Sequence, residues 1–493
     1  MPSPGILGRL PFDGPRPDEP APHRGNQSAM TSVLRRALPA VLGVLLLTGC
    51  ATEVVLGQAS PGPGEPVDVG ADEFPITGAS DEPIDQFARN ALADIETFWT
   101  AAYPEFFEEE FTPLEGGYFS VDSEAVDEGA YPETGIGCEG SPTSPDSVAG
   151  NAFYDPACDL IAYDRALLQE LATDYGRFLV PVVMAHEFGH AMQGRFGFSE
   201  RGIQDETQAD CLAGAWTGWV AAGEAEHVSI RTPELDDVVR GFLLLRDDVG
   251  SDPDDTQAHG SYFDRVSAFY EGFDGGVGPC RDDFGADRLF TAAAFGNDAD
   301  YLSQGNAAFE DLVEIVDVSL PAFWGEVFPA AFGSDFEAPT IESFQSSAPD
   351  CADLADRDLG YCAEDNTVYV DETDLATPAY EEIGDFALAT AISLPYSLAV
   401  RDQAGLSTDD GAATRSAVCL TGWYEAQWYN NAFTDVLPEA AISPGDIDEA
   451  VQFLLTYGVD DQVFPNLDAS GFELVGAFRN GFLQGGDACE LEG

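Results

Sequence analysis

The pattern of apolar and polar positions predicts helices around a small sheet. Apolar residues recur at helical spacing in a first stretch near 85–103 and in later stretches at about 171–194, 205–222 and 261–273. Between the first two stretches, short apolar runs around 117–164 predict strands, with a turn at Asp155-Pro156. The sequence therefore predicts an α+β fold with a mixed sheet flanked by helices.

The chain also matches itself in three places. In order, 97–111 matches 322–336, 176–211 matches 384–419 without a gap, and the segment AFYEGFDGGVGPC ending at Cys280 matches AFRNGFLQGGDAC ending at Cys489. Three matches in one order predict a duplication. We expect a first domain at 85–280, a connector at 281–310 and a second copy of the same fold at 311–493.

The cysteines follow the duplication. Each copy has an early close pair and a late distant pair, and the simplest pairing is the same in both. We therefore expect four disulfides: Cys138 with Cys158, Cys211 with Cys280, Cys351 with Cys362, and Cys419 with Cys489. The alternative is that the thiolate of Cys211 binds a metal ion. Its counterpart Cys419 persists in a copy that has no histidine, so the disulfide is favoured.

The N-terminal region predicts export. From Met30 the chain runs through two arginines and a short apolar segment to LTGC, which is typical of a signal peptide at 30–49. LTGC resembles a bacterial lipobox, which implies a lipid on Cys50 and a membrane anchor on the extracytoplasmic face. Residues 50–84 then form a flexible tether, and residues 1–29 are expected to precede the true start of translation.

Charge excludes one class of partner. The 493 residues include 89 acidic and 20 basic side chains, and every basic residue is arginine. A polyanion would be repelled by almost every face of such a molecule, so we expect no nucleic-acid partner.

Two of the five histidines lie four residues apart in AHEFGHAMQ. On a helix, His186 and His190 share a face and can bind one metal ion. Glu187 lies close by, where a carboxylate can take a proton from zinc-bound water. This HExxH pattern predicts a zinc site with Glu187 as the catalytic base, although two buried core histidines would show the same spacing.

A second pair of polar residues follows in DETQADCLAGAW. Glu206 and Asp210 are again four apart, so Glu206 can be the third zinc ligand while Asp210 orients an imidazole. HExxH followed by ExxxD resembles the thermolysin-like gluzincins, and QADCLAGAW resembles the bacterial neutral zinc metallopeptidases. The resemblance covers about residues 85–280 and implies a minimal gluzincin core with one Zn²⁺ per chain.

The resemblance also implies substrate contacts. NAFYDPACDLIAYD at 151–164 is similar to the edge strand of such enzymes, which implies that Asn151 and the backbone of Ala152 bind an extended peptide; an ordinary hairpin is the alternative. His259 is similar to a histidine that stabilises the oxyanion, and a surface position is its alternative. His227 is expected to have no role.

These residues predict a zinc-dependent peptidase that acts on peptides or proteins outside the cell. The alternative is a non-catalytic, zinc-containing binding or scaffold lipoprotein. In the second copy the positions of the site become Leu394, Pro395, Leu398, Thr414 and Val418. We therefore expect that copy to bind no zinc, and to form one wall of the substrate cleft or only to bury a face of the first domain. Pro395 is expected to break its helix or to lie in the first turn.

Overall fold

The computed structural model describes residues 66–133, 135–199, 201–351, 354–438, 440–464 and 469–491. The fold is a mixture of helices and small sheets, so the α+β prediction is confirmed. The expected signal peptide, lipidated Cys50 and residues 1–29 lie outside the described residues, as do residues 50–65 of the expected tether. The flexible tether is wrong for 66–84: Val69 and Ile76 are buried, Thr77 forms a β-bridge with Phe119, and a helix begins at Pro83.

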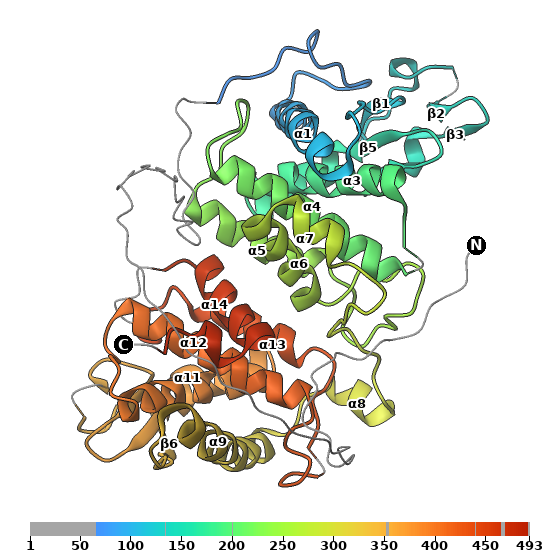
Figure 1. The fold of residues 1–493 in the computed structure, drawn as a ribbon. Helices are drawn as coiled ribbons and strands as arrows, with labels where there is room; N and C mark the ends of the chain where they lie inside the picture. The colour runs from blue at the N-terminus through green and yellow to red at the C-terminus, as the bar shows by residue number, and fades with distance from the viewer. Residues whose placement is uncertain are drawn as a thin grey trace, which may run out of the picture.

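The first half, residues 66–282, begins with a long helix and a small sheet and continues as helices (Figure 1). Its strands are β1 (Gly117–Val121), β2 (Ile136–Cys138), β3 (Ser141–Thr143), β4 (Ala152–Asp155) and β5 (Leu160–Asp164). Its helices are α1 (Pro83–Phe107), α2 (Arg165–Asp174), α3 (Leu179–Phe196), α4 (Gly202–Ala221), α5 (Thr232–Leu245), α6 (Tyr262–Gly275) and α7 (Val277–Asp282), with short turns at Glu128–Ala130 and Pro145–Ser147.

The second half, residues 309–491, follows a connecting segment that contains α8 (Asp298–Ser303). Its strands are β6 (Thr340–Phe344), β7 (Leu359–Cys362) and β8 (Thr367–Asp371). Its helices are α9 (Phe309–Phe332), α10 (Thr377–Glu382), α11 (Asp385–Gln403), α12 (Gly411–Tyr429), α13 (Asp446–Tyr457) and α14 (Gly471–Gln484), with short turns at Glu372–Ala376 and Gly486–Ala488.

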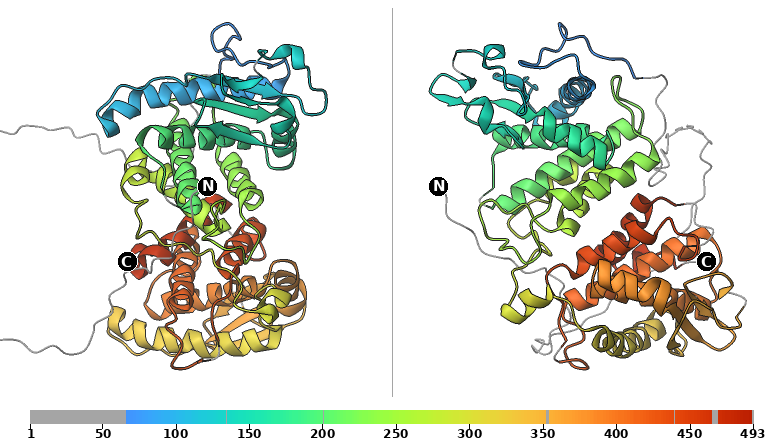
Figure 2. Two further views of the ribbon diagram at one scale, coloured as in Figure 1. Left: turned by 90° about the vertical axis from the view of Figure 1, so that its right-hand side faces the viewer. Right: turned by 180° about the vertical axis from the view of Figure 1, so that it is seen from behind.

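The halves are stacked end to end, with α5, α6, α13 and α14 in the middle (Figures 1 and 2). The first sheet and α1 lie at one end, and α9 and β6 lie at the other. The two main sheets have the same plan. In each sheet the strand that comes last in the chain lies in the centre. It pairs in parallel with the first strand and antiparallel with the strand just before it, which gives the orders β1-β5-β4 and β6-β8-β7.

Close helix packing is also alike in the two halves. A Cβ on Gly272 of α6 would collide with the carbonyl oxygen of Cys211 on α4. Likewise, a Cβ on Gly481 of α14 would collide with the carbonyl oxygen of Cys419 on α12. In both pairs the absence of a side chain lets two helix backbones touch.

Four disulfides join the pairs of cysteines predicted from the sequence: Cys138–Cys158, Cys211–Cys280, Cys351–Cys362 and Cys419–Cys489. Disulfides persist mainly in oxidising compartments, so these four indicate an exported protein.

In each half a buried aspartate caps the N-terminus of a helix in the other half. Asp236 of α5 accepts a hydrogen bond from the backbone N–H of Phe472 at the start of α14 (2.8 Å). Asp448 of α13 accepts one from the N–H of Phe263 at the start of α6 (2.9 Å). A carboxylate at a helix N-terminus satisfies free N–H groups and interacts favourably with the helix dipole. Each half therefore caps a helix of the other.

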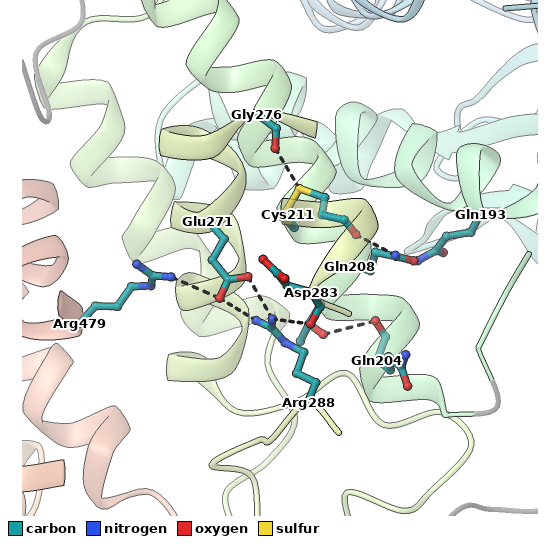
Figure 3. Close-up of a disulfide and its surroundings, with 11 residues drawn as sticks. Gln193, Gln204, Gln208, Cys211, Glu271, Gly276, Asp283, Arg288 and Arg479 are labelled. Carbon is teal, nitrogen blue, oxygen red and sulfur yellow. Dashed lines mark hydrogen bonds and ion pairs between the residues drawn. A yellow bond between two sulfur atoms is a disulfide. The ribbon is translucent and has the colours of Figure 1, made fainter. Parts of the chain in front are cut away.

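Glu271 of α6 adds a charged link between the halves. It binds Arg479 of α14 (3.3 Å) as well as Arg288 of the connecting segment (3.0 Å), and Figure 3 shows both arginines directed at this carboxylate.

Two helix predictions are wrong in detail. The single helix expected at 171–194 is two helices, α2 and α3, because Gly176 between them has a φ of +85°, in the left-handed region that a helix cannot continue through. The break expected at Pro395 does not occur, since α11 runs through this proline. A buried proline costs a helix roughly 3 kcal/mol, and the extensive burial of α11 outweighs that cost. Helix α5 was not predicted.

Helix α9 is long and apolar enough to cross a membrane by length and composition alone. It packs on the second half instead, where Leu320, Trp324 and Phe328 are fully buried. About a third of its most apolar stretch, 33%, is buried in this way.

Candidate metal centre

Helix α3 carries polar side chains through an apolar core. Apolar residues cover nearly every face of this helix, from Leu179 to Met192. The spacing of His186 and His190 places both imidazoles on the side that faces α4, and their rings are 4.7 Å apart. Burial of the helix therefore fixes where these two polar groups point.

Both imidazoles meet a carboxylate from α4. The Nε2 atoms of His186 and His190 are 3.1 Å apart. The carboxylate oxygens of Glu206 lie 3.3 Å from Nε2 of His186 and 3.5 Å from Nε2 of His190. Two nitrogens and a carboxylate thus converge on one point, as ligands of a single metal ion would.

The opposite ring nitrogens are held by hydrogen bonds that point away from this centre. Nδ1 of His186 lies 2.8 Å from Oδ1 of Asp210. Nδ1 of His190 lies 2.8 Å from Oε1 of Gln193. The amide nitrogen of Gln193 donates to Oε1 of Gln208 (3.0 Å), which leaves Oε1 of Gln193 as an acceptor; Figure 3 shows the two glutamines side by side. Both Nδ1 atoms therefore carry the proton when the rings are neutral.

This tautomer suits a cation. With each proton on Nδ1, the Nε2 lone pairs of His186 and His190 face one another, and a positive charge between them relieves the repulsion. The neighbouring carboxylates also favour a positive charge here, because they stabilise the protonated form of each imidazole. Burial opposes ionisation, but Asp210 and Glu206 outweigh it and raise the pKa of His186 to about 10. Despite the same burial, hydrogen bonds from both histidines hold the pKa of Glu206 well below its usual value. The residues present fit a Zn²⁺ ion.

Asp210 is itself held by a buried arginine. Nε and Nη2 of Arg265, on α6, lie 2.7 Å and 2.8 Å from the two carboxylate oxygens. Both side chains are almost fully buried, at 2% and 1% exposure. Burial alone would raise the pKa of Asp210, but Arg265 and then His186 lower it. The carboxylate stays ionised and fixes the orientation of the His186 ring.

Glu187 stands between α3 and the sheet. Its Oε2 accepts a hydrogen bond from the backbone N–H of Tyr154 (2.9 Å) on strand β4. Burial raises the pKa of Glu187 above its ordinary value. A carboxylate with a raised pKa is a better general base near neutral pH.

Strand β4 combines the two alternatives that the sequence left open. It forms a hairpin with β5, in which Ala152 pairs with Tyr163, and within the described chain it is also the edge strand of its sheet. Asn151 and Ala152 line the cavity in front of Glu187. An edge strand in this place can accept an extended peptide.

A cavity of about 950 Å³ contains all the candidate residues. It is lined by His186, Glu187, His190, Glu206, Asp210, Asn151, Ala152 and His259. Every residue that lines it lies between 151 and 265, so the second half does not form a wall of this cavity as one alternative expected.

His259 lies at the rim of this cavity, with 48% of its side chain exposed. Its Nδ1 is 3.2 Å from Asp247. That hydrogen bond raises the pKa of His259, with a smaller contribution from Glu206. The ring can therefore present a proton on Nε2 towards the cavity.

The equivalent place in the second half is nearly filled. Leu394, Pro395, Leu398 and Thr414, which align with the first half's polar residues, line a cavity of only about 90 Å³. Val418, which aligns with Asp210, is fully buried.

Three supporting residues were missed in the sequence. Arg265 is the one basic residue of α6, beside a run of apolar and aromatic residues, and this could have indicated a buried partner. Gln193, three residues after His190, was a weaker signal. Tyr154 acts through its backbone, so its side-chain type carried no signal.

Comparison with known proteins identifies no family. Three uncharacterized proteins, one from Mycobacterium bovis and two from strains of Mycobacterium tuberculosis, are 27% identical to this chain over 181 residues. The match covers 31% of this chain and 60% of each relative, so the chain spans less than two thirds of their length. No family model and no solved structure matches the chain.

Proposed function

We propose that this protein is an exported zinc-dependent peptidase of the gluzincin type. The observation that carries the proposal is the convergence of His186, His190 and Glu206 beside the buried carboxylate of Glu187. Three protein ligands leave a metal with an open position, whereas structural zinc sites are normally closed by four. This difference favours catalysis over the alternative of a scaffold.

The substrate is an extended peptide bound along the free edge of β4. Asn151 and Ala152 lie at the start of this strand and line the cavity. Backbone hydrogen bonds to the strand would place a peptide carbonyl in front of Glu187. A cavity of about 950 Å³ has room for several side chains of such a peptide.

Zinc, when bound, supplies a Lewis acid that lowers the pKa of water and polarises the scissile carbonyl. Glu187 accepts a proton from the attacking water and delivers it to the leaving amine. The N–H of Tyr154 holds one oxygen of Glu187 in place, so the other is free to move this proton. His259 donates a hydrogen bond to the carbonyl oxygen as negative charge develops there.

Arg265 and Asp210 act on the ligand His186 rather than on the substrate. Their buried ion pair keeps Nδ1 of His186 protonated and its Nε2 directed at the centre. Gln193 does the same for His190.

We further infer that the second half is a degenerate copy without zinc. The shared sheet plan, the matching glycine contacts and the matching disulfides support a duplication. The apolar residues around the small cavity of the second half support the loss of its chemistry. The same proposal includes a lipid anchor at Cys50, on the extracytoplasmic face of the membrane.

A pair of variants tests the peptidase. Glu187→Gln should lower the rate of peptide cleavage by about 10²- to 10⁴-fold, typical of a lost general base, and should keep one zinc per chain. Glu206→Gln should lose zinc. Glu170→Gln is a matched control, because Glu170 lines the same cavity but belongs to neither group.

The assay is cleavage of a diverse peptide library by the purified mature chain, with products identified by mass spectrometry and zinc measured by elemental analysis. Near-normal cleavage by a fully zinc-loaded Glu187→Gln variant would contradict the proposed mechanism. Zinc binding without any cleavage by the wild type would favour the scaffold alternative.

A further inference from the structure

A second group of ligand-type residues lies in the second half, away from the candidate zinc centre. Asp385 begins α11, and Asp446 and Glu449 lie in the first turn of α13. One carboxylate oxygen from each lies within 4.8 Å of the others. All three residues are buried, with exposures of 4%, 2% and 7%.

Backbone N–H groups satisfy only part of this cluster. Oδ2 of Asp385 accepts from Ala307 (2.8 Å), and Oδ2 of Asp446 accepts from Ser443 (2.7 Å). The Oδ1 atoms of both aspartates are buried, and no N–H or hydroxyl of the described residues donates to them; Asp385 instead lies within hydrogen-bond reach of the Glu449 carboxyl group. A buried carboxylate oxygen that accepts no hydrogen bond is costly, and either a proton shared with a neighbouring carboxyl group or a bound cation can offset that cost.

The first half provides an internal comparison. A Cβ on Gly176, before α3, would meet the side chain of Asp237 on α5. In the same way, a Cβ on Gly384, before α11, would meet the side chain of Glu449 on α13. Gly176 and Gly384 are also matched in the gapless alignment, so Asp237 and Glu449 occupy equivalent places.

The reciprocal caps extend this equivalence. Asp236 and Asp448 each cap a helix of the opposite half, and each directly precedes one of the matched acids. When Asp236 is matched with Asp448, Asp446 corresponds to Glu234, and each lies two residues before its capping aspartate. The alignment of 176–211 with 384–419 places Asp385 on Arg177.

The substitution reverses a charge. In the first half Arg177 forms an ion pair with Glu234 (3.5 Å), and Arg240 lies 3.8 Å from Asp237. In the second half a carboxylate replaces the guanidinium, and none of the three acids forms an ion pair with a described residue. The first half contains its own cation at this place, whereas none of the second half's described residues supplies one.

Three adjacent buried carboxylates cannot all remain ionised without a counter-charge. Burial, and then the charges of neighbouring acids, raise the pKa of Asp446 and of Glu449 well above their ordinary values. Either protons or a cation must neutralise the group. Because the donors are all oxygens, a hard cation such as Ca²⁺ suits them better than zinc, which prefers nitrogen and sulfur.

An entry route is present. Asp385 and Asp446 line a cavity of about 600 Å³ between the two halves, which has room for the water ligands that would complete a coordination shell. We propose that Asp385, Asp446 and Glu449 bind one Ca²⁺ ion, which replaces in the second half the arginine of the first. The ion would stabilise the junction of α11, α13 and the connecting segment.

Calcium titration of the full mature chain tests this site without reference to peptidase activity. After dialysis against a chelator, CaCl₂ alone is titrated by calorimetry at pH 7.5, and melting is followed with and without the ion. The wild type should show one site with a Kd below about 1 mM, the range of extracellular calcium modules, and a raised Tm.

Two variants locate the site, and one controls for general acidity. Asp385→Arg, which restores the first half's residue, and the near-isosteric Asp446→Asn should each weaken binding at least tenfold and abolish the rise in Tm. Glu381→Gln removes one exposed charge nearby and should keep both. Absence of a tight site in the wild type, or unchanged affinity in the folded Asp446→Asn variant, would overturn the proposal and leave the cluster neutralised by protons.

Discussion

Replacing Arg265 by methionine is the sharpest structural test of the candidate centre. The guanidinium donates to both oxygens of Asp210 at 2.7 Å and 2.8 Å, inside the protein. Methionine is of similar length, so it fills most of the space but leaves Asp210 as a buried charge with only His186 beside it.

Breaking a buried ion pair by removing one partner costs about 3–5 kcal/mol. In a domain of roughly 200 residues, each kcal/mol lowers Tm by about 2–4 °C, so Arg265→Met should melt roughly 6–20 °C below the wild type. Adding Asp210→Asn should recover part of this loss, because the amide is uncharged and its oxygen can still accept from Nδ1 of His186.

Thermal unfolding followed by circular dichroism measures these differences, and zinc content measured on the same samples reports the effect on the centre. Arg281→Met is the matched control, since Arg281 binds Asp282 at the same 2.7 Å but on the surface. That variant should melt close to the wild type. A similar small change in Arg265→Met, or a double variant less stable than the single one, would show that the buried pair does not hold the centre together.

Two further predictions concern pH and packing. Asp210 and Glu206 raise the pKa of His186 to about 10 in the metal-free protein, so protons compete with zinc for this residue. The zinc affinity should therefore rise about tenfold per pH unit, for each proton displaced, as the pH increases from 6 to 8. Competition with a chelator measures this affinity, and a flat or falling affinity over that range would contradict the prediction. Gly272→Ala should destabilise the protein by about 1–3 kcal/mol, the usual cost of overpacking, because the new Cβ would collide with the carbonyl of Cys211. Gly285→Ala, where the Cβ meets open space, is the control, and urea unfolding measures both variants. Equal stability of the two variants would show that α4 and α6 can move apart.

The sequence by itself determined the local features of this protein. Helical periodicity placed His186 and His190 on one face of a helix. The same rule placed Glu206 and Asp210 on one face of the following helix, because the direction of a side chain along a helix depends only on spacing. Self-comparison also predicted the disulfide pairs, which the structure contains. These inferences needed no knowledge of which helices pack together.

Tertiary structure decided everything that depends on a distant neighbour. Helix α11 continues through Pro395 because burial outweighs a local preference for a break, and α3 begins where Gly176 packs against Asp237 of α5. Arg265 became part of the centre only when α6 packed on α4. The charge reversal between Arg177 and Asp385 is visible in an alignment, but its consequence is not. The free energy of a buried charge depends on the groups packed around it, and those come from segments far apart in the chain.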